Sequence, residues 1–427
     1  MITTKKKMIA VLMMPLAFQV SATYGNALQD RVAELEKQLK ALKSELAGDK
    51  KKQQEKGVEL KKGTRFQYGG YIKVDAMMSD YDSGERATAA IGENIYVPST
   101  IPVGGSGGDS RFHANVKTSR LWFKTFTETD VGTIRSHFEA DYLTFEGDER
   151  ISNSSGNRLR HAFLAWDYEP GSSILAGQTW STFFNVGVLP EAVDFVGPTS
   201  GTLFNRQTQL RWTKKAGNGS FMLAAENPSA SLYDGGAGFS PSNNYDDNSM
   251  PDVVARYNGK AGNLSYSIAG VMREIAYQDS TSGLEDDTYG YGISVSGKWT
   301  FGKDDLKFML SQGNLGRYIA LNAFRDGAIE TDGDIDLIDQ IGGFVAYRHW
   351  WSDKWRSTFI YAMTKSDNPD TVSMTTNESV SNASLNLIYS PTKNLSFGGE
   401  YILADIEREN GDEGEMKRLQ FMAKWAF

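Results

Sequence analysis

The chain has 427 residues, with 45 Lys and Arg against 53 Asp and Glu, a formal net charge of −8 and no cysteine. The absence of cysteine excludes disulfides and thiolate sites, and four histidines leave little for a metal centre, so we expect no metal or cofactor. The acidic balance disfavours nucleic acid as a partner. A mean hydropathy of −0.43 excludes a bundle of membrane helices. Abundant glycine and aromatic residues still permit a membrane β-barrel, in which only alternate residues face lipid.

Residues 1–27 have the layout of a secretory signal peptide. Three lysines precede an apolar run over 8–20, and small residues follow. Cleavage is predicted after Ala27, with Ala22 as the alternative. The other interpretation is an N-terminal membrane anchor, but the run is short for a span of roughly 20 apolar residues. The signal therefore predicts export from the cytoplasm.

A heptad pattern follows over residues 28–47. Apolar residues recur at alternating spacings of four and three: Leu28, Val32, Leu35, Leu39, Leu42 and Leu46. This spacing puts one narrow apolar seam along a helix, and a seam without a partner in its own segment predicts a coiled coil between copies of the chain. The alternative is an amphipathic helix that packs on the rest of the chain. Residues 48–64 are charged and lack a seam, which predicts a linker.

From residue 65 onward the apolar period becomes two, as in strands with one buried face. In the last segment Leu419, Phe421 and Trp425 alternate with Arg418 and Gln420. Sixteen strands are predicted, over 66–78, 112–127, 132–145, 158–169, 172–180, 203–215, 219–228, 251–259, 263–274, 288–300, 305–314, 338–350, 355–365, 379–390, 395–407 and 414–427.

The connections between these strands alternate strictly between tight turns and longer loops. This asymmetry is typical of an outer-membrane barrel, and an even strand number puts both termini in the periplasm. The fold class is therefore all-β: a 16-stranded antiparallel transmembrane β-barrel over 65–427, with an N-terminal coiled-coil helix. The terminal Phe427 is similar to the signal that the barrel assembly machinery recognises. A soluble sandwich or solenoid is the alternative, but soluble sheets do not show this loop asymmetry.

Charged residues with inward parity are candidates for lining the lumen, which is too wide for side chains alone to fill. On the lipid face an Arg or Lys would cost about 2–4 kcal/mol near the midplane. The candidates at this parity are Lys73, Asp75, Arg120, Lys124, Arg135, His137, Glu139, Asp141, Gln209, Arg211, Arg256, Arg356, Arg418 and Lys424. The parity of Arg158 and Arg160 is ambiguous, because Leu164 and Trp166 share it.

The long connection over 181–202 is the most apolar of the loops, and exposure to water would make it a liability. We expect it to fold inward and narrow the pore. Glu191 and Asp194 could then face a basic wall that contains Arg120, Arg135 and Arg211, and the opposed charges would create a transverse field. Clustered arginines favour carboxylate-bearing solutes. The alternative is that these arginines are ordinary solvated residues.

The stretches GQTWSTF at 177–183, PEAVDF at 190–195 and GPT at 197–199 resemble the fifth strand and inward loop of the DcaP-like outer-membrane porins. The resemblance implies a homotrimeric porin for small anionic organic molecules, dicarboxylates among them. It also points to Arg206 and Arg211, just after the loop, as pore residues. Arg206 has the same strand parity as Trp212, which argues against a pore-facing Arg206 unless Arg206 lies at a rim. The partners implied are outer-membrane lipids and lipopolysaccharide, anionic solutes, the assembly machinery and other copies.

Three rival functions remain open. An enzyme is disfavoured, because His137 near Asp141 and Ser136 is the one local cluster and Ser136 has lipid-facing parity. The coiled coil could tether the envelope by binding peptidoglycan or a periplasmic partner, which is compatible with transport. A sugar-selective or general porin is the closest rival, but the aromatic residues fall mostly at lipid-facing parity or near the rims.

Overall fold

A closed antiparallel sheet dominates the computed structural model, which describes residue 37 and residues 58–61, 63–86, 91–144, 152–234, 247–279 and 283–427. Apart from Lys37, the predicted signal peptide and coiled-coil helix, including all six seam residues from Leu28 to Leu46, lie outside the described residues. They stay predictions. Among the described residues, no helix is both long and apolar enough to cross a bilayer.

The sheet and its connections consist of short 3-10 turns and strands whose bounds follow. The strands are β1 (Val58–Lys61), β2 (Thr64–Tyr81), β3 (Asp109–Asn115), β4 (Arg120–Thr129), β5 (Gly132–Asp141), β6 (Arg158–Glu169), β7 (Ser172–Trp180), β8 (Arg206–Ala216), β9 (Gly219–Glu226), β10 (Leu232–Asp234), β11 (Asp252–Ala261), β12 (Leu264–Gln278), β13 (Glu285–Phe301), β14 (Asp304–Gly313), β15 (Gly327–Ile329), β16 (Ile335–Leu337), β17 (Asp339–Trp350), β18 (Trp355–Asp367), β19 (Asn377–Tyr389), β20 (Leu395–Arg408) and β21 (Glu413–Ala426). The 3-10 turns are η1 (Ile91–Glu93), η2 (Pro98–Thr100), η3 (Val186–Val188) and η4 (Thr199–Gly201).

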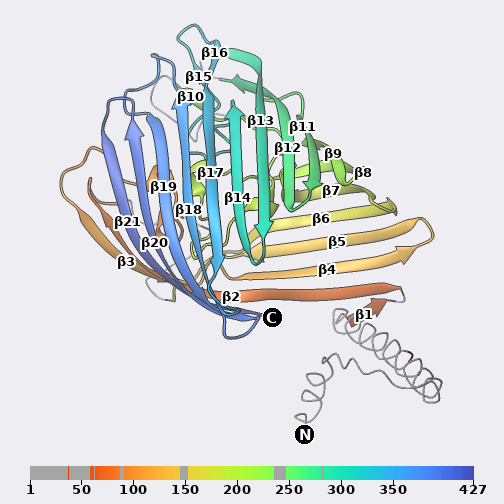
Figure 1. Ribbon diagram of the computed structural model, residues 1–427. Coiled ribbons are helices and arrows are strands. Elements are labelled where there is room, and N and C mark those ends of the chain that lie inside the picture. The colour runs from red at the N-terminus through yellow and green to blue at the C-terminus, as the bar shows by residue number, and fades with distance from the viewer. Residues whose placement is uncertain are drawn as a thin grey trace, which may run out of the picture. The chain divides into compact units, whose positions relative to one another are not determined.

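The barrel closes where its last strand pairs with its first. β21 pairs with β2 from Tyr71↔Ala426 to Tyr81↔Met416, and Phe427 N donates to Gly70 O at 3.1 Å. Sixteen barrel strands result, because β3 and β4 are two parts of one strand that both pair with β2. Figure 1 shows neighbouring strands of this wall side by side, with the C-terminus at the end where the turns are tight.

The start of β2 extends past the end of β21, and the short strand β1 covers that edge. Val58 of β1 pairs with Phe66 of β2. Uncovered strand edges invite pairing with other chains, so this contact protects the seam. The end of the predicted linker over 48–64 is therefore a strand of the sheet, because β1 pairs with β2. The predicted strand 112–127 also breaks at 116–119, where the Ser119 hydroxyl bonds the backbone of Lys73 instead.

The two faces of each strand differ as a membrane barrel requires. On β13, Ile293 and Val295 point outward with 56% and 42% exposure, whereas Ser294 and Ser296 between them are buried inside the barrel. A ring of exposed aromatic residues surrounds the turn end: Trp166, Trp212, Trp299, Phe301, Tyr347, Trp351, Trp355, Phe397 and Trp425. Aromatic girdles mark the interface between lipid and water.

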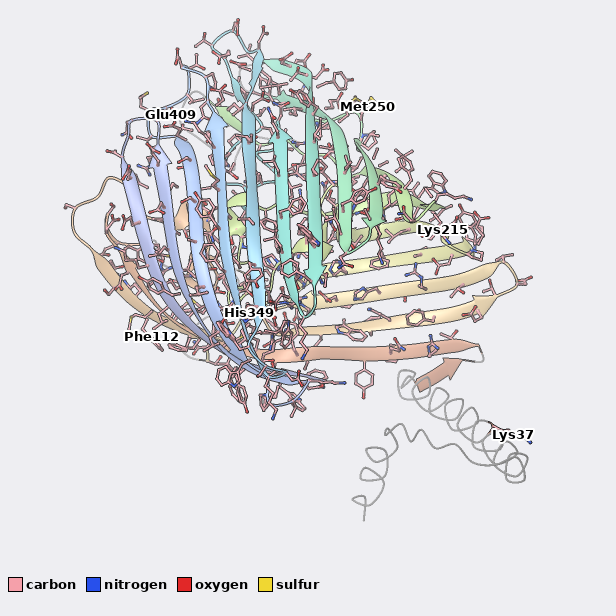
Figure 2. The ribbon with its side chains drawn as sticks, viewed as in Figure 1. Lys37, Phe112, Lys215, Met250, His349 and Glu409 are labelled. Carbon is pink, nitrogen blue, oxygen red and sulfur yellow. The ribbon has the colours of Figure 1, made fainter. Side chains whose placement is uncertain are left out.

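The loop end carries the long connections, and these fill much of the inner space there. Figure 2 places Met250 and Glu409 at this end and Lys215 and His349 toward the turn end. The inner face of β20 is apolar at this level, and its Ile402 and Ile406 share a buried cluster with Tyr96 and Ile101 of the loop after β2. Strands β10, β15 and β16 form a small separate sheet in the loops.

The prediction of sixteen strands is confirmed. The alternation of tight turns and longer loops holds except after β20, where the connection over 409–412 is no longer than the turn over 390–394. β6 and β7 begin and end where predicted. The connections after β12 (residues 279–284) and after β20 (residues 409–412) are shorter than predicted, because the flanking strands extend further.

Candidate channel constriction

The connection after β7, residues 181–205, lies along the inner face of the wall from β9 to β20. Arg256 of β11 donates to the carbonyl oxygen of Phe184 at 2.9 Å. Further along the loop, the Lys307 ammonium of β14 donates to Leu189 O at 2.8 Å. These long side chains point into the lumen and satisfy backbone carbonyl groups that would otherwise lack partners.

A buried carboxylate holds the middle of the loop. Glu400 of β20 accepts hydrogen bonds from the backbone N–H groups of Val193 and Asp194, at 3.0 and 3.1 Å. Lys73 of β2 donates to Val193 O at 2.6 Å. Charge-assisted bonds are about twice as strong as neutral ones, so this point of the loop is firmly fixed.

Glu191 forms the ion pair that joins the loop to β17 and β18. Arg356 contacts both of its carboxylate oxygens, with 2.6 Å from Nε to Oε2, and Arg348 Nη1 lies 3.4 Å from Oε2. Burial raises the pKa of Glu191, but hydrogen bonds and charges from the two guanidinium groups outweigh this and hold it below the usual value. Glu191 is therefore ionised at neutral pH.

The wall of β4, β5 and β6 carries alternating guanidinium and carboxylate groups. Arg160 Nε donates to Glu139 at 2.8 Å and its Nη1 donates to Asp141 at 2.9 Å. Arg158 binds Asp141 through two bonds of 2.9 and 2.8 Å. Arg120 Nη1 lies 3.3 Å from Glu139. The carboxylates thus hold the three guanidinium groups in fixed positions.

A bulge in β6 explains why parity is ambiguous there. Glu139 pairs with His161 and the next residue pairs with Leu159, which leaves Arg160 as an extra residue. Such a bulge lets Arg160 and His161 both face inward, while Leu159 and Leu164 on either side face outward.

Arg206 completes this basic wall at the loop end of β8. Its guanidinium lies 4.6 Å from the ring centroid of Trp180 and 5.8 Å from that of Phe204. Within the described part of the chain, its Nη1 has no hydrogen-bond partner. The same holds for Nε of Arg120. The wall therefore retains donors that its own carboxylates do not use.

The loop approaches this wall through Phe195. Its ring centroid lies 5.4 Å from the guanidinium of Arg160 and 5.8 Å from that of Arg158. Apolar residues from other loops, including Ile95 and Leu321, pack with Phe195 in one cluster. The free passage is consequently narrow at this level.

A cavity of about 320 Å³ brings several of the predicted pore residues together. Arg120, Glu191, Asp194 and Arg356 line it, together with Lys73 and Lys424, which are also candidates by their inward parity, and with Lys393, which the sequence prediction did not include. Five basic side chains and two carboxylates in one polar cavity could bind and pass an anion.

The other predicted residues lie elsewhere on the inner wall. Arg135 pairs with Asp167 near the turn end, with 2.7 Å from Nη2 to Oδ1. Arg418 donates to Gly92 O at 2.9 Å and so holds a loop. Arg211 has an Nε without a hydrogen-bond partner among the described residues.

The pairing predicted for the two loop carboxylates also differs from the observed one. Glu191 contacts Arg356 and Arg348, and Asp194 accepts a bond from Tyr96 N at 2.9 Å, rather than either facing Arg135 or Arg211. The loop runs along the wall from β11 to β20, which brings its carboxylates to that wall first.

Some aromatic and histidine side chains occupy the inner face, while most aromatic residues of the strands point outward as expected. His137 and His161 stack at 5.4 Å, and Trp122, Phe163 and Trp180 contact them edge-on. Ser136 faces outward as predicted and shares a 2.6 Å hydrogen bond with Thr125.

A sequence profile of the DcaP outer membrane protein family matches residues 28–427. The chain belongs to this family. The DcaP outer-membrane channel of Acinetobacter baumannii is 22% identical, with a TM-score of 0.70 over 87% of this chain and 99% of that one. An anion-selective porin of Comamonas acidovorans is 12% identical, with a TM-score of 0.55 over 85% and 100%. OmpT of Vibrio cholerae is 11% identical, with a TM-score of 0.53 over 87% and 100%.

At these identities the structural matches establish a shared fold, and a comparison with curated sequences finds no match. Membership of the DcaP family makes the protein an outer-membrane channel of the porin class. Sequence reasoning missed Arg348 and Glu400, and it left Arg158 and Arg160 undecided. One signal could have revealed Arg160, because a polar pair at 160–161 interrupts an otherwise regular alternation.

The Glu191 to Arg356 pair predicts a measurable change in channel noise. Glu191→Gln or Arg356→Gln leaves one charge without its partner and removes roughly 1–3 kcal/mol of loop anchoring. Single-channel recordings should therefore show more flicker in each single variant than in the double variant E191Q/R356Q.

Asp353→Asn supplies the control, because it breaks an exposed ion pair with Lys303 in the turns, away from the loop. Quiet single variants, or a double variant noisier than both, would show that the pair does not anchor the loop.

Proposed function

We propose that this DcaP-family channel passes small anionic solutes, dicarboxylates and similar organic acids, by diffusion past an arginine-lined constriction. One observation carries the proposal. On the wall of β4–β8, Arg120, Arg158, Arg160 and Arg206 meet only Glu139 and Asp141 as carboxylate partners among the described residues. The surplus of positive charge lies where Phe195 of the inward loop narrows the passage.

The arrangement favours a carboxylate over a cation for two reasons. Guanidinium groups present parallel N–H donors that match a carboxylate, and Arg206 and Arg120 retain unused donors. Because Glu139 and Asp141 already partly neutralise the wall, a permeating anion is attracted without being trapped, as conduction requires. The description of the Comamonas porin as anion-selective agrees with this selectivity.

The same reasoning orients the barrel. Its tight turns and the end of β21 lie at one end, which we assign to the periplasm, and the long loops face outside. The outer girdle then contacts outer-membrane lipids and lipopolysaccharide. Phe427, at the seam with Gly70, is the segment we expect the barrel assembly machinery to bind.

We also assign the heptad over 28–47 to self-association, with a homotrimer as the assembly. One solved form of Vibrio cholerae OmpT, at a TM-score of 0.51 and 11% identity, is a trimer. A three-stranded coiled coil would bury the seam from Leu28 to Leu46.

A sugar-selective porin is the second candidate, and the inner aromatic rings favour it. Trp122, Phe163 and Trp180 lie on the inner face of β4, β6 and β7, where flat rings could stack on sugars. The charge surplus beside them favours the anion channel.

Reversal potentials in planar bilayers under a KCl gradient test the selectivity. The parent channel should prefer chloride, and Arg206→Gln or Arg120→Gln should lower the anion-to-cation permeability ratio. Removal of a charge worth about 1 kcal/mol corresponds to a change of roughly fivefold. Lys215 is exposed at the turn end, so Lys215→Gln should leave the permeability ratio unchanged. Cation preference of the parent, or unaltered ratios in both arginine variants, would refute the proposal.

Deletion of residues 28–57 tests the coiled coil. The shortened chain keeps β1 and the whole barrel, so it should still insert into bilayers and conduct. Light scattering with detergent correction should show loss of the trimer or its weaker association. A trimer of unchanged stability would show that the heptad does not drive self-association.

A further inference from the structure

A second cavity, of about 380 Å³, lies on the inner wall near the turn end and has no lining residue in common with the cavity at Glu191. Its lining includes Arg256 and Lys260 of β11, Ser265 of β12, Lys298 of β13 and Asn185 of the inward loop. Residues of η3, where the loop turns, cover it. The cavity is thus bounded by barrel wall and loop together.

The charge inside this cavity has one sign. Arg256, Lys260 and Lys298 line it, and no Asp or Glu does so among the described residues. The nearest carboxylate contact is Asp305, 3.9 Å from the Lys298 ammonium and not in the lining. In the cavity at Glu191, by contrast, carboxylates and cations are mixed.

Hydrogen bonds to uncharged acceptors of the protein hold the Arg256 side chain in place. Arg256 donates to Asn258 Oδ1 at 2.7 Å, to Asn185 Oδ1 at 3.0 Å and to Phe184 O at 2.9 Å. Asn185 Nδ2 donates in turn to Ser296 at 2.9 Å. All these partners are uncharged, so the positive charge of Arg256 stays uncompensated while its position is fixed.

Two lysines on neighbouring parts of this wall can move, whereas Arg256 cannot. Lys260 is exposed and Lys298 is about one-third exposed, so their ammonium groups can adjust to a ligand. The hydroxyl of Ser265 and the amide of Asn258 add neutral groups beside them. A fixed charge with two adjustable ammonium groups fits a solute that carries two negative charges.

We propose that this cavity binds a small dianion, a dicarboxylate or a phosphate, as a station separate from the constriction. Lys260 and Lys298 contact the two charged ends, and Arg256 supplies the fixed positive potential. The volume suits a solute of a few carbon atoms and is too small for a protein segment. Successive weak sites speed conduction, because each lowers the barrier for leaving the previous one. The proposal concerns binding and does not rest on the anion preference of the channel.

Isothermal titration of the purified full-length protein in detergent at low ionic strength tests it, with disodium succinate and inorganic phosphate in separate runs. One of the two probes should bind, and K260Q/K298Q should weaken that binding about tenfold or more. K260R/K298R, which keeps both charges, should restore it. If the double variant folds poorly, the single variant Lys260→Gln serves instead. Its affinity should lie between those of the parent and the double variant.

Two controls separate this site from the rest of the molecule. Lys303→Gln removes a lysine of the β13–β14 turn that lies outside the cavity and pairs with Asp353, and it should leave binding unchanged. Lys214→Gln, which breaks an exposed ion pair with Glu169 outside the cavity lining, should also leave binding unchanged. Absence of binding by both probes, or equal loss in K303Q and K260Q/K298Q, would overturn the proposal.

Discussion

Hydrogen bonding of the backbone in lipid is the constraint from which the rest of this structure follows. Hydrocarbon offers no partner to an N–H or C=O group, so strands can cross a membrane only in a sheet without free edges. Here β21 returns to β2, Phe427 bonds Gly70, and β1 covers the first residues of β2, which β21 does not reach. Closure then forces one face of every strand toward lipid and the other toward the lumen.

The proposed selectivity rests on how the inner wall divides its charges. The strands supply long charged side chains, and the inward loop settles against those of β11–β20, where Glu400, Arg356 and Lys307 satisfy its backbone and its carboxylate. The wall of β4–β8 stays opposite, with arginines positioned by Glu139 and Asp141. Ion pairs and hydrogen bonds from β11–β20 thus fix the loop. We propose that the surplus positive charge of β4–β8 attracts the solute.

The fold could be predicted from the sequence because strand parity and turn chemistry are local. Ile293 and Ser294 report their faces by alternation alone, and tight turns delimit β6 and β7. The site was less predictable, because it depends on distant contacts. Nothing near Glu191 in the sequence indicates Arg356 as its partner, and the bulge that turns both Arg160 and His161 inward reverses the parity on which the prediction relied.

Cysteine cross-linking across the seam tests the central claim most directly, since the chain contains no cysteine of its own. Val74 and Ala423 are paired neighbours on β2 and β21, within the distance that a disulfide spans. In intact outer membranes, V74C/A423C should oxidise to a cross-linked species with altered gel mobility. V74C/L419C, displaced by four residues along β21, should not. Failure of the paired variant, or equal cross-linking of both, would contradict a closed barrel with this register.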